Sequence, residues 1–305
     1  MSPTASHYAE YYAARGVVGA LGALPWRAAS AAGAALGALG YRPLGIRKGV
    51  VERQIAAAFP EFTPARVHAV AREAYENLGR TFIETAVVPT LGRDGILDLF
   101  EGADNWHLVD DAMATGRGLI VVTGHLGNWE LGGAYIAARG VPFHAVARGM
   151  ANPLFDRYVT GTREQIGMRI MHDSEAVRRA PRALRDGAAV AFLSDQGVKG
   201  LASTFVPFFG RPAKTPRGPA VFALRLQSPI VFGVAVRQPS GKFRLKLQEI
   251  EVLDTGDREA DVDAIVARYT MALEREVRLT PGQYFWHHRR WRRQPPGTPP
   301  ELAEP

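Results

Sequence analysis

Residues 116–148 read GRGLIVVTGHLGNWELGGAYIAARGVPFHAVAR, and the pattern of this stretch decides the fold class. A short apolar strand is followed by a helix that ends at Gly140, and a second apolar strand then runs up to Arg148. Strands that alternate with helices assemble into a largely parallel sheet with helices on both faces. The stretch therefore predicts an α/β fold with a central, largely parallel sheet flanked by helices.

The same alternation continues along the chain. Helices are predicted over 152–167, 174–187, 215–227 and 257–278, and buried strands over 168–171, 188–196 and 229–238. Residues 240–253 alternate apolar and polar side chains, which favours an antiparallel strand at the edge of the sheet. We expect one α/β domain over residues 51–293, which opens with two helices, and a disordered Pro-rich tail over 294–305.

The N-terminal segment, residues 1–50, contains a weakly apolar stretch over 16–41. Its only formal charge is Arg27, its bulk is Ala and Gly, and Pro25 interrupts it, so it lacks the roughly 20 strongly apolar residues of a spanning helix. Basic residues follow it directly: Arg42, Arg47 and Lys48. This combination predicts a helical membrane-docking segment that lies in an anionic interface. The alternative is a soluble, Ala-rich packing helix.

Composition restricts the possible chemistry. The 305 residues include no cysteine, which excludes disulfides, thiolate nucleophiles and cysteine metal sites and favours a cytosolic setting. The formal net charge of +7 and the isoelectric point near 9.8 indicate an anionic partner. Nucleic acid, an acidic carrier protein, a phosphorylated ligand and an anionic membrane all meet this condition.

His125 and Glu130 lie five residues apart, just beyond the first predicted strand. On one uninterrupted helix this separation would turn the two side chains about 140° apart, so they meet only if the chain bends between them. Gly127 permits the bend, and Asn128 can cap a helix that carries Glu130 in its first turn. His125 then lies at the carboxyl end of a strand, where open α/β sheets bind ligands.

A carboxylate that holds one imidazole nitrogen prepares the other to act as a general base, and we expect Glu130 to serve His125 in this way. The chain has no G-x-S-x-G sequence and no cysteine, so the nucleophile is most simply a hydroxyl or amine of the substrate. The spacing also fits a structural pair, with His125 a hydrogen-bonded polar residue and Glu130 complementing a helix dipole. A metal site is disfavoured because H-x4-E differs from H-E-x-x-H.

The stretch GHLGNWE resembles the H-x4-[DE] block of glycerophospholipid-type acyltransferases. It has the H-[FLW]-G-N-W-[DE] form of the bacterial lipid A late acyltransferases and the related phosphatidylinositol mannoside acyltransferases. Further stretches that resemble this family follow in the same order: AAAFPEF at 56–62, VAR at 146–148, NPLFDRYV at 152–159, SDQG at 194–197, VPFFGRPAKTPRGPA at 206–220 and QYFWHHRRWRR at 283–293. The resemblance covers about residues 45–293, and the N-terminus is less hydrophobic than the anchor of many members.

The resemblance implies acyl transfer from a thioester of acyl carrier protein or coenzyme A to a hydroxyl of a membrane glycolipid of the lipid A precursor type. His125 would accept the hydroxyl proton and Glu130 would stabilise the imidazolium, with no covalent acyl-enzyme and no cofactor besides the co-substrate. It also implies a protein bound to the cytoplasmic face of the inner membrane.

Other candidate substrate-binding residues follow the remaining predicted strands. Arg148 falls on the same edge of the sheet as His125 and would meet phosphate or developing negative charge. The resembling family carries an Asp-Gln pair where this chain has Asp195 and Gln196, which would orient Arg148 or the lipid headgroup. A turn or helix-cap role is the alternative for this pair.

A predicted helix start supplies a second anion site. Thr215 would cap this helix, and Lys214 and Arg217 would add two cations to its backbone amides. Further on, Trp286, Trp291 and the neighbouring arginines suit the headgroup region of a bilayer. They could also stack on nucleic acid, but no nucleic-acid-binding motif accompanies them.

We therefore expect a monomeric acyltransferase that binds an anionic membrane surface, without nucleic acid or metal. The first alternative is a lysophospholipid or phosphatidylinositol mannoside acyltransferase that uses coenzyme A. The second is a non-catalytic protein that binds membranes or nucleic acid through its basic surface.

Overall fold

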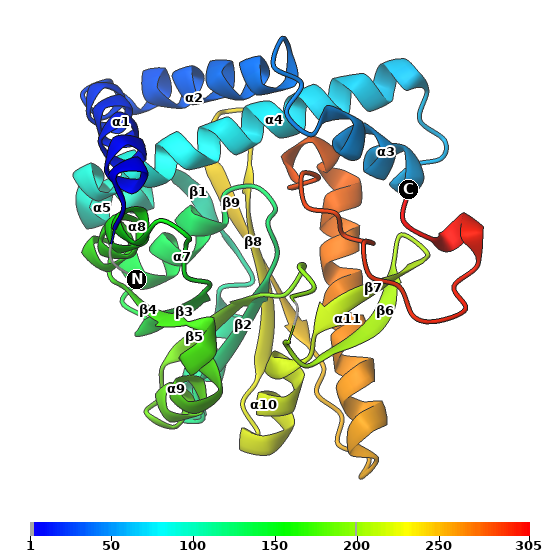
Figure 1. Ribbon diagram of the computed structural model, residues 1–305. Coiled ribbons are helices and arrows are strands. Elements are labelled where there is room, and N and C mark those ends of the chain that lie inside the picture. The colour runs from blue at the N-terminus through cyan, green and yellow to red at the C-terminus, as the bar shows by residue number, and fades with distance from the viewer. Residues whose placement is uncertain (1–2, 199) are drawn as a thin grey trace.

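The predicted α/β fold is confirmed by the computed structural model, which describes residues 3–198 and 200–305. Within these ranges seven strands form one sheet in the order β1, β9, β8, β2, β5, β3, β4, and two more form a separate hairpin (Figure 1). The strands are β1 Phe100–Asp104, β2 Leu119–Thr123, β3 Phe143–Ala147, β4 Met168–His172, β5 Ala189–Leu193, β6 Ser203–Phe208, β7 Arg211–Pro216, β8 Ile230–Arg237 and β9 Phe243–Ile250.

Helices surround the main sheet. They are α1 Ala5–Gly22, α2 Trp26–Tyr41, α3 Lys48–Ala58, α4 Pro64–Val87, α5 Gly92–Asp98, α6 His107–Ala114, α7 Trp129–Ala138, α8 Pro153–Gln165, α9 Asp173–Arg185, α10 Gly218–Leu226 and α11 Arg258–Leu279. In β2, Ile120 and Val122 pack into the core that α9, α10 and α11 cover, whereas Leu119 and Val121 pack into the core that α6 and α7 cover. Both faces of this strand are buried, which explains its continuous apolar sequence.

The strand β9 pairs antiparallel with β8 as predicted, but it does not lie at the edge of the sheet. The edge is β1, which pairs parallel with the other side of β9. The sequence pattern did not reveal β1 because only Phe100 of its five residues is buried. The expected edge position of residues 240–253 is therefore wrong, although their strand pairing is right.

Residues 203–216 form the antiparallel hairpin β6–β7, whose last two residues the sequence assigned to the start of a helix. Thr215 and Pro216 belong to β7, and α10 begins only at Gly218 with Arg217 as its N-cap residue. Thr215 therefore cannot cap this helix. Pro216 is tolerated here because it is the last residue of the strand, where a missing N–H costs little.

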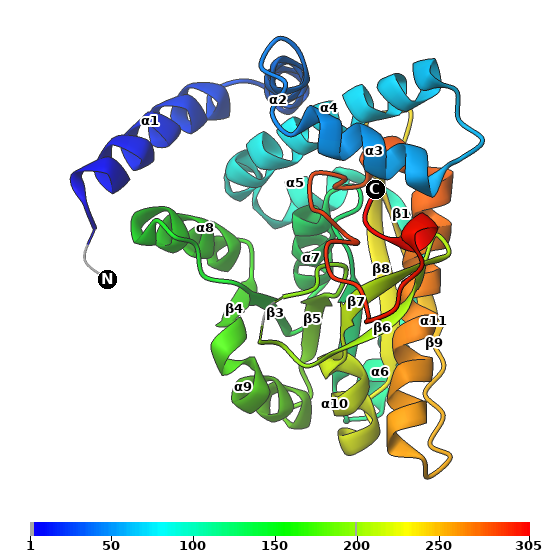
Figure 2. The same ribbon diagram turned by 45° about the vertical axis from the view of Figure 1, so that its right-hand side comes forward.

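The N-terminal helices pack on α4, which crosses one end of the sheet (Figure 1). Glycines bring α2 and α4 into backbone contact: a Cβ at Gly33 would lie 2.7 Å from the carbonyl oxygen of Gly79, and one at Gly37 would collide with the carbonyl of Tyr75. One face of α2 therefore packs closely on α4, while Leu36 and Leu39 of the same helix remain exposed. By contrast, α1 buries no residue and projects beside α8 (Figure 2). None of the described helices is long and apolar enough to cross a membrane.

We expect Gly79→Ala to lower the free energy of unfolding by about 1–3 kcal/mol, because the new methyl group would overlap the backbone of Gly33 and Gly37. Gly161→Ala in α8 is the matched control, since no heavy atom lies within 4 Å of the added Cβ. Urea unfolding of both variants measures the difference. Equal midpoints would contradict the close approach of α2 to α4.

Residues 281–293, which we call the C-terminal strap, close the core at the end of the chain. Trp286 and Trp291 are fully buried, and their indole N–H groups donate to the carbonyl oxygens of Pro281 (2.8 Å) and Phe208 (3.2 Å). Their expected position in the headgroup region is therefore wrong. They lie inside because Trp286 packs against Phe59, and Trp291 against Phe208, both core residues.

The tail that follows the strap also differs from its prediction. Disorder was expected for residues 294–305, but the structure places this tail against the hairpin and the strap. Arg211 donates to the carbonyl oxygen of Ala303 at 2.7 Å, and Arg289 forms an ion pair with Glu304. These two contacts hold the tail without giving it regular structure beyond one short 3-10 turn.

Candidate functional site

The loop that carries His125 folds as the sequence predicted. β2 ends at Thr123, Gly127 has a positive φ of 65°, and the side chain of Asn128 accepts the N–H of Leu131 at 3.0 Å to cap α7. A side chain at Gly127 would also collide with the carbonyl of Ala235, so only glycine fits both the conformation and the space. The loop consequently presents His125 at the carboxyl end of the parallel strands.

Two neighbouring elements fix the backbone of this loop. The N–H of Gly127 donates to the carbonyl oxygen of Gln283 in the strap at 3.0 Å, and the N–H of Asn128 donates to that of Ala235 in β8 at 2.9 Å. The side-chain amide of Asn77 in α4 donates to the carbonyl oxygen of Gly127 at 3.0 Å. Sheet, strap and α4 therefore hold the loop from three sides.

The carboxylate that holds the His125 imidazole is Asp195. Nδ1 of His125 donates to Oδ1 of Asp195 at 2.7 Å, and the backbone N–H of His125 donates to Oδ2 at 3.0 Å. Strands β2 and β5 are parallel neighbours with Thr123 opposite Leu193, so residues two positions beyond each strand end come together. This shared offset is the sequence signal that could have paired the two residues.

Asp195 is ionised although it is almost completely buried. Burial by itself would raise its pKa, but the His125 ring and backbone N–H, together with the charge of Arg290, lower the pKa to about 2. Because the ionised carboxylate only accepts hydrogen bonds, Nδ1 of His125 carries the proton of this contact, and Nε2 is the ring nitrogen left for a ligand. The imidazole is thus held in the tautomer that a general base requires.

Glu130 does not contact His125, contrary to the expectation from spacing. Its carboxylate forms an ion pair with Arg163 of α8, with Nε of Arg163 2.8 Å from Oε2, and it also accepts the indole N–H of Trp129 at 3.2 Å. Burial lowers the pKa of Arg163, but Glu130 more than compensates and raises it. The first turn of α7 therefore directs Glu130 toward α8, a partner that the sequence pattern could not indicate.

The remaining surroundings of the imidazole are two aromatic rings and an amide. The ring centroids of Trp129 and Phe285 lie 4.8 Å and 5.6 Å from that of His125. Nε2 of Gln196 lies 3.3 Å from Nδ1 and 3.5 Å from Nε2 of the imidazole. The His125 side chain is 19% exposed, so solvent or a ligand reaches a ring that is otherwise enclosed.

A buried ionic network lies beneath the loop. Glu84 of α4 is fully buried and accepts hydrogen bonds from Ser30 (2.5 Å), Asn128 (2.9 Å) and Arg237 (2.7 Å to each carboxylate oxygen). These partners come from α2, from the His125 loop and from β8. The network therefore connects the N-terminal helices to the residue that caps α7.

The structure separates the predicted anion-binding residues into two groups. Thr215 is buried, and Arg217 forms ion pairs with the α11 carboxylates of Glu259 (2.8 Å) and Asp263 (3.6 Å), so neither faces a ligand site. Arg148 is exposed directly after β3 and makes no hydrogen bond or ion pair with the described residues. Lys214 is half-buried on β7 against Gly197, two residues after Asp195.

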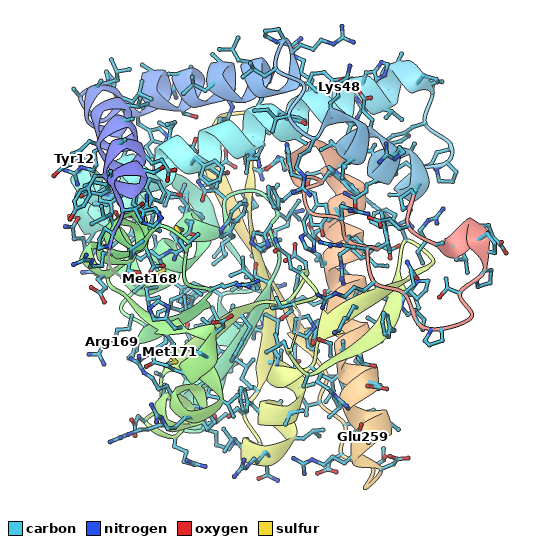
Figure 3. The ribbon with its side chains drawn as sticks, in the orientation of Figure 1. Tyr12, Lys48, Met168, Arg169, Met171 and Glu259 are labelled. Atoms are coloured by element: carbon cyan, nitrogen blue, oxygen red, sulfur yellow. The ribbon has the colours of Figure 1, made fainter. Side chains whose placement is uncertain are left out.

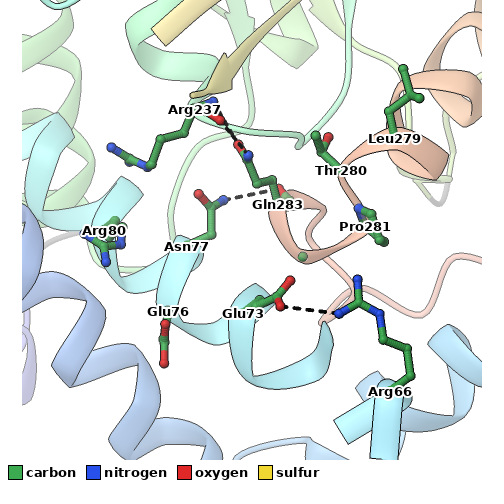
Figure 4. A pocket seen from close by; sticks show the side chains of 11 residues that line it. Arg66, Glu73, Glu76, Asn77, Arg80, Arg237, Leu279, Thr280, Pro281 and Gln283 are labelled. Atoms are coloured by element: carbon green, nitrogen blue, oxygen red, sulfur yellow. Dashed lines mark hydrogen bonds and ion pairs between the residues drawn. The ribbon is translucent and has the colours of Figure 1, made fainter. Parts of the chain in front are cut away.

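A polar pocket of about 350 Å³ lies behind the His125 loop (Figure 4). Asn77 and Gln283, which both hydrogen-bond to the Gly127 backbone, belong to its lining, together with Arg80 and Arg237. Neither His125 nor Asp195 lines it, so this pocket is not the place where the imidazole meets a ligand. In the part of the chain that the structure describes, no group of three His, Asp or Glu side chains is arranged to hold a metal ion.

Comparison with known proteins identifies similar chains. The family model described as "Bacterial lipid A biosynthesis acyltransferase" matches residues 2–293. The lipid A biosynthesis lauroyltransferase of Escherichia coli (strain K12) is 27% identical over 278 residues, which cover 90% of this chain and 89% of that protein. The palmitoleoyltransferase of the same strain is 26% identical over 279 residues, or 90% and 88%. A phosphatidylinositol mannoside acyltransferase of Mycobacterium tuberculosis (strain ATCC 25618 / H37Rv) is 28% identical over 158 residues, 49% of this chain and 48% of that protein.

Proposed function

The chain belongs to the bacterial lipid A biosynthesis acyltransferase family, and from this premise we propose that it transfers a fatty acyl chain from an acyl thioester to a hydroxyl of a membrane glycolipid. The observation that carries the proposed mechanism is the hydrogen bond between His125 and Asp195 at the carboxyl end of the sheet. It gives the imidazole the tautomer, the orientation and the counter-charge of a general base.

The reaction needs one base and no covalent intermediate. Nε2 of His125 takes the proton of the acceptor hydroxyl while the oxygen attacks the thioester carbonyl, and Asp195 stabilises the resulting imidazolium. When the tetrahedral intermediate collapses, the carbon–sulfur bond breaks and the imidazolium protonates the leaving thiolate. The products are an ester and a free thiol, and His125 is neutral again.

Glu130, in this proposal, acts through Arg163 and not through the imidazole. The Glu130–Arg163 ion pair joins the first turn of α7 to α8, so it fixes Trp129, whose ring packs on His125. Gln196 lies beside the imidazole and would donate to an oxygen of the bound thioester or acceptor. Arg148 and Lys214 would contact the phosphate of the acceptor or of the donor, which is either acyl carrier protein or coenzyme A.

Labelled acyl donors test the proposed function directly. Purified protein is incubated with acyl carrier protein or coenzyme A thioesters and with a lipid A precursor, a lysophospholipid or a phosphatidylinositol mannoside, and the lipids are separated. Label in the lipid A precursor is the expected result. Transfer to another acceptor alone would support the coenzyme A-dependent alternatives, and no transfer to any acceptor would favour a non-catalytic binding protein.

We further propose that the protein is peripheral at the cytoplasmic face of the inner membrane and docks there through its N-terminal helices. Large apolar side chains are exposed on α2 and on the α2–α3 turn: Leu36, Leu39, Leu44 and Ile46. Arg42, Arg47 and Lys48 lie beside them. Lys48 and Glu259 lie at opposite ends of the molecule (Figure 3), so this basic, apolar end is distinct from the acidic start of α11.

Full-length protein is expected to sediment with anionic vesicles and to be partly released by high salt. Replacing Arg42 and Arg47 with alanine removes about 2 kcal/mol of attraction, or about 30-fold in the partition coefficient. Arg178→Ala with Arg182→Ala on exposed positions of α9 is the control, since it removes the same number of exposed arginines elsewhere. If high salt released none of the bound protein, peripheral attachment would be refuted. If the control variant lost as much vesicle binding as the Arg42 and Arg47 variant, this docking surface would be refuted.

A further inference from the structure

Arg290 in the C-terminal strap is a buried cation without a carboxylate partner. Only 3% of the residue is exposed, and no carboxylate of the described residues lies within 4 Å of its guanidinium. Its Nη1 donates to the carbonyl oxygen of Lys214 and its Nη2 to the hydroxyl of Thr215, each at 2.6 Å. A guanidinium buried on neutral acceptors alone is costly, so a compensating charge must lie close by.

That charge is Asp195, the partner of His125. Burial lowers the pKa of Arg290, while the charge of Asp195 acts in the opposite direction. Arg290 in turn helps to lower the pKa of Asp195. The Tyr284 phenol lies beside Asp195, where burial and that carboxylate raise its pKa well above the ordinary value, so it stays neutral. The site therefore contains a row of three ionisable groups: His125, Asp195 and Arg290.

The two hydrogen bonds of Arg290 also position the segment that carries Asp195. They hold Lys214 and Thr215 of β7, and Lys214 packs against Gly197, where an added Cβ would lie 2.9 Å from the Lys214 carbonyl oxygen. The backbone N–H of Arg290 is itself fixed by Oε1 of Gln54 at 2.7 Å. Arg290 thus ties the hairpin and α3 to the loop that follows β5.

We propose that Arg290 is a positioning residue that keeps Asp195 ionised and in place, and that its fixed positive charge limits how readily His125 holds a second proton. This inference rests on the proposed role of His125 as the base. With His125 neutral, the row carries no net charge, whereas with imidazolium it carries +1. The charge of Arg290 therefore opposes the addition of a second proton to the imidazole.

The other groups around His125 do not reverse the effect that the charge of Arg290 has on the protonation of the imidazole. Glu130 is neutralised by Arg163 on α8. His288 of the strap is neutral, because burial and the charges of Arg290 and His125 outweigh Asp195 and lower its pKa to about 4. The remaining neighbours, which are Trp129 of α7, Gln196 of the β5–β6 loop and Phe285 and Tyr284 of the strap, carry no charge at neutral pH.

The test is an NMR titration of the His125 ring in the full chain, compared with the pH dependence of kcat. Because Arg290→Met removes the cation, the midpoint of the His125 titration should move to higher pH by about one unit. The acid limb of the pH dependence of kcat should move by the same amount. Arg290→Lys keeps the charge but loses the paired hydrogen bonds to Lys214 and Thr215. It should therefore lower kcat, while the midpoint of the His125 titration stays within a few tenths of a unit of the wild-type value. Arg292→Met, which removes an exposed arginine of the strap, should change neither.

A midpoint in Arg290→Met that stays at the wild-type value would overturn the electrostatic role, and a downward shift would reverse its sign. If Arg290→Met does not fold, Arg290→Gln keeps a donor for the Lys214 carbonyl and removes the same charge, so the same shift is expected. The titration is read without substrate. A shifted midpoint in a protein that never transfers an acyl chain would therefore support the role of Arg290 and contradict only the proposed reaction.

Discussion

Replacing His125 with alanine is expected to lower the rate of acyl transfer by about 10²- to 10⁴-fold while the protein remains folded. The loss follows because the variant lacks the imidazole that Asp195 holds at the carboxyl end of β2 and β5, where it would take the hydroxyl proton. Folding survives because His125 is partly exposed and belongs to a loop whose backbone is held by its own hydrogen bonds. Steady-state kinetics with a labelled thioester, together with urea unfolding, measure both quantities.

His107→Ala is the matched control, since His107 is exposed at the start of α6 and lies outside the site. It should transfer the acyl chain at the wild-type rate. A His125→Ala protein that keeps full activity would end the proposed mechanism. One that loses activity only because it unfolds at a much lower urea concentration would reduce His125 to a structural residue.

Asp195→Asn should produce a second large loss, between about 10²- and 10⁴-fold in kcat. Asparagine keeps the size of the side chain but removes the charge that stabilises imidazolium, and its amide can turn an N–H toward Nδ1 and favour the wrong tautomer.

Glu130→Gln should instead leave Arg163 buried without its partner and lower the free energy of unfolding by about 3 kcal/mol, with a smaller effect on kcat.

These two variants distinguish the two possible carboxylate partners of His125. Measuring kcat and the urea midpoint for both gives a pattern that only one assignment fits. If Glu130→Gln abolished turnover in a stable protein while Asp195→Asn turned over normally, the partner suggested by spacing would be right and the one suggested by geometry wrong.

Local signals made the centre of the fold predictable. Leu119–Thr123, Gly127 and Asn128 each encode one step of the strand, turn and helix that present His125, and every step depends on residues within a short stretch. The partner of His125 could not be found in this way. Glu130 is close in sequence, but Asp195 becomes the neighbour only through the register of two parallel strands 70 residues apart.

The elements that the sequence concealed have physical reasons for being inconspicuous. The hairpin β6–β7 contains Pro207, Pro212 and Pro216, residues that argue against a strand, and both residues of its turn, Phe209 and Gly210, have a positive φ. In the strap, tryptophans next to arginines match the composition of a membrane interface as well as that of a core. Only the surrounding rings, such as Phe59 and Phe208, decide that Trp286 and Trp291 lie inside.

The position of the strap in the chain has a consequence for biosynthesis. A ribosome delivers the N-terminal helices and the sheet before it delivers residues 281–293, so the growing chain already holds the residues of the base while the two tryptophans that fill its core are still in the exit tunnel. Arg290, whose charge lowers the pKa of Asp195, arrives at the same late moment. The surroundings of the imidazole are therefore complete only after residues 281–293 have been synthesised. The N-terminal helices of a nascent chain can consequently contact other surfaces before the site is able to act.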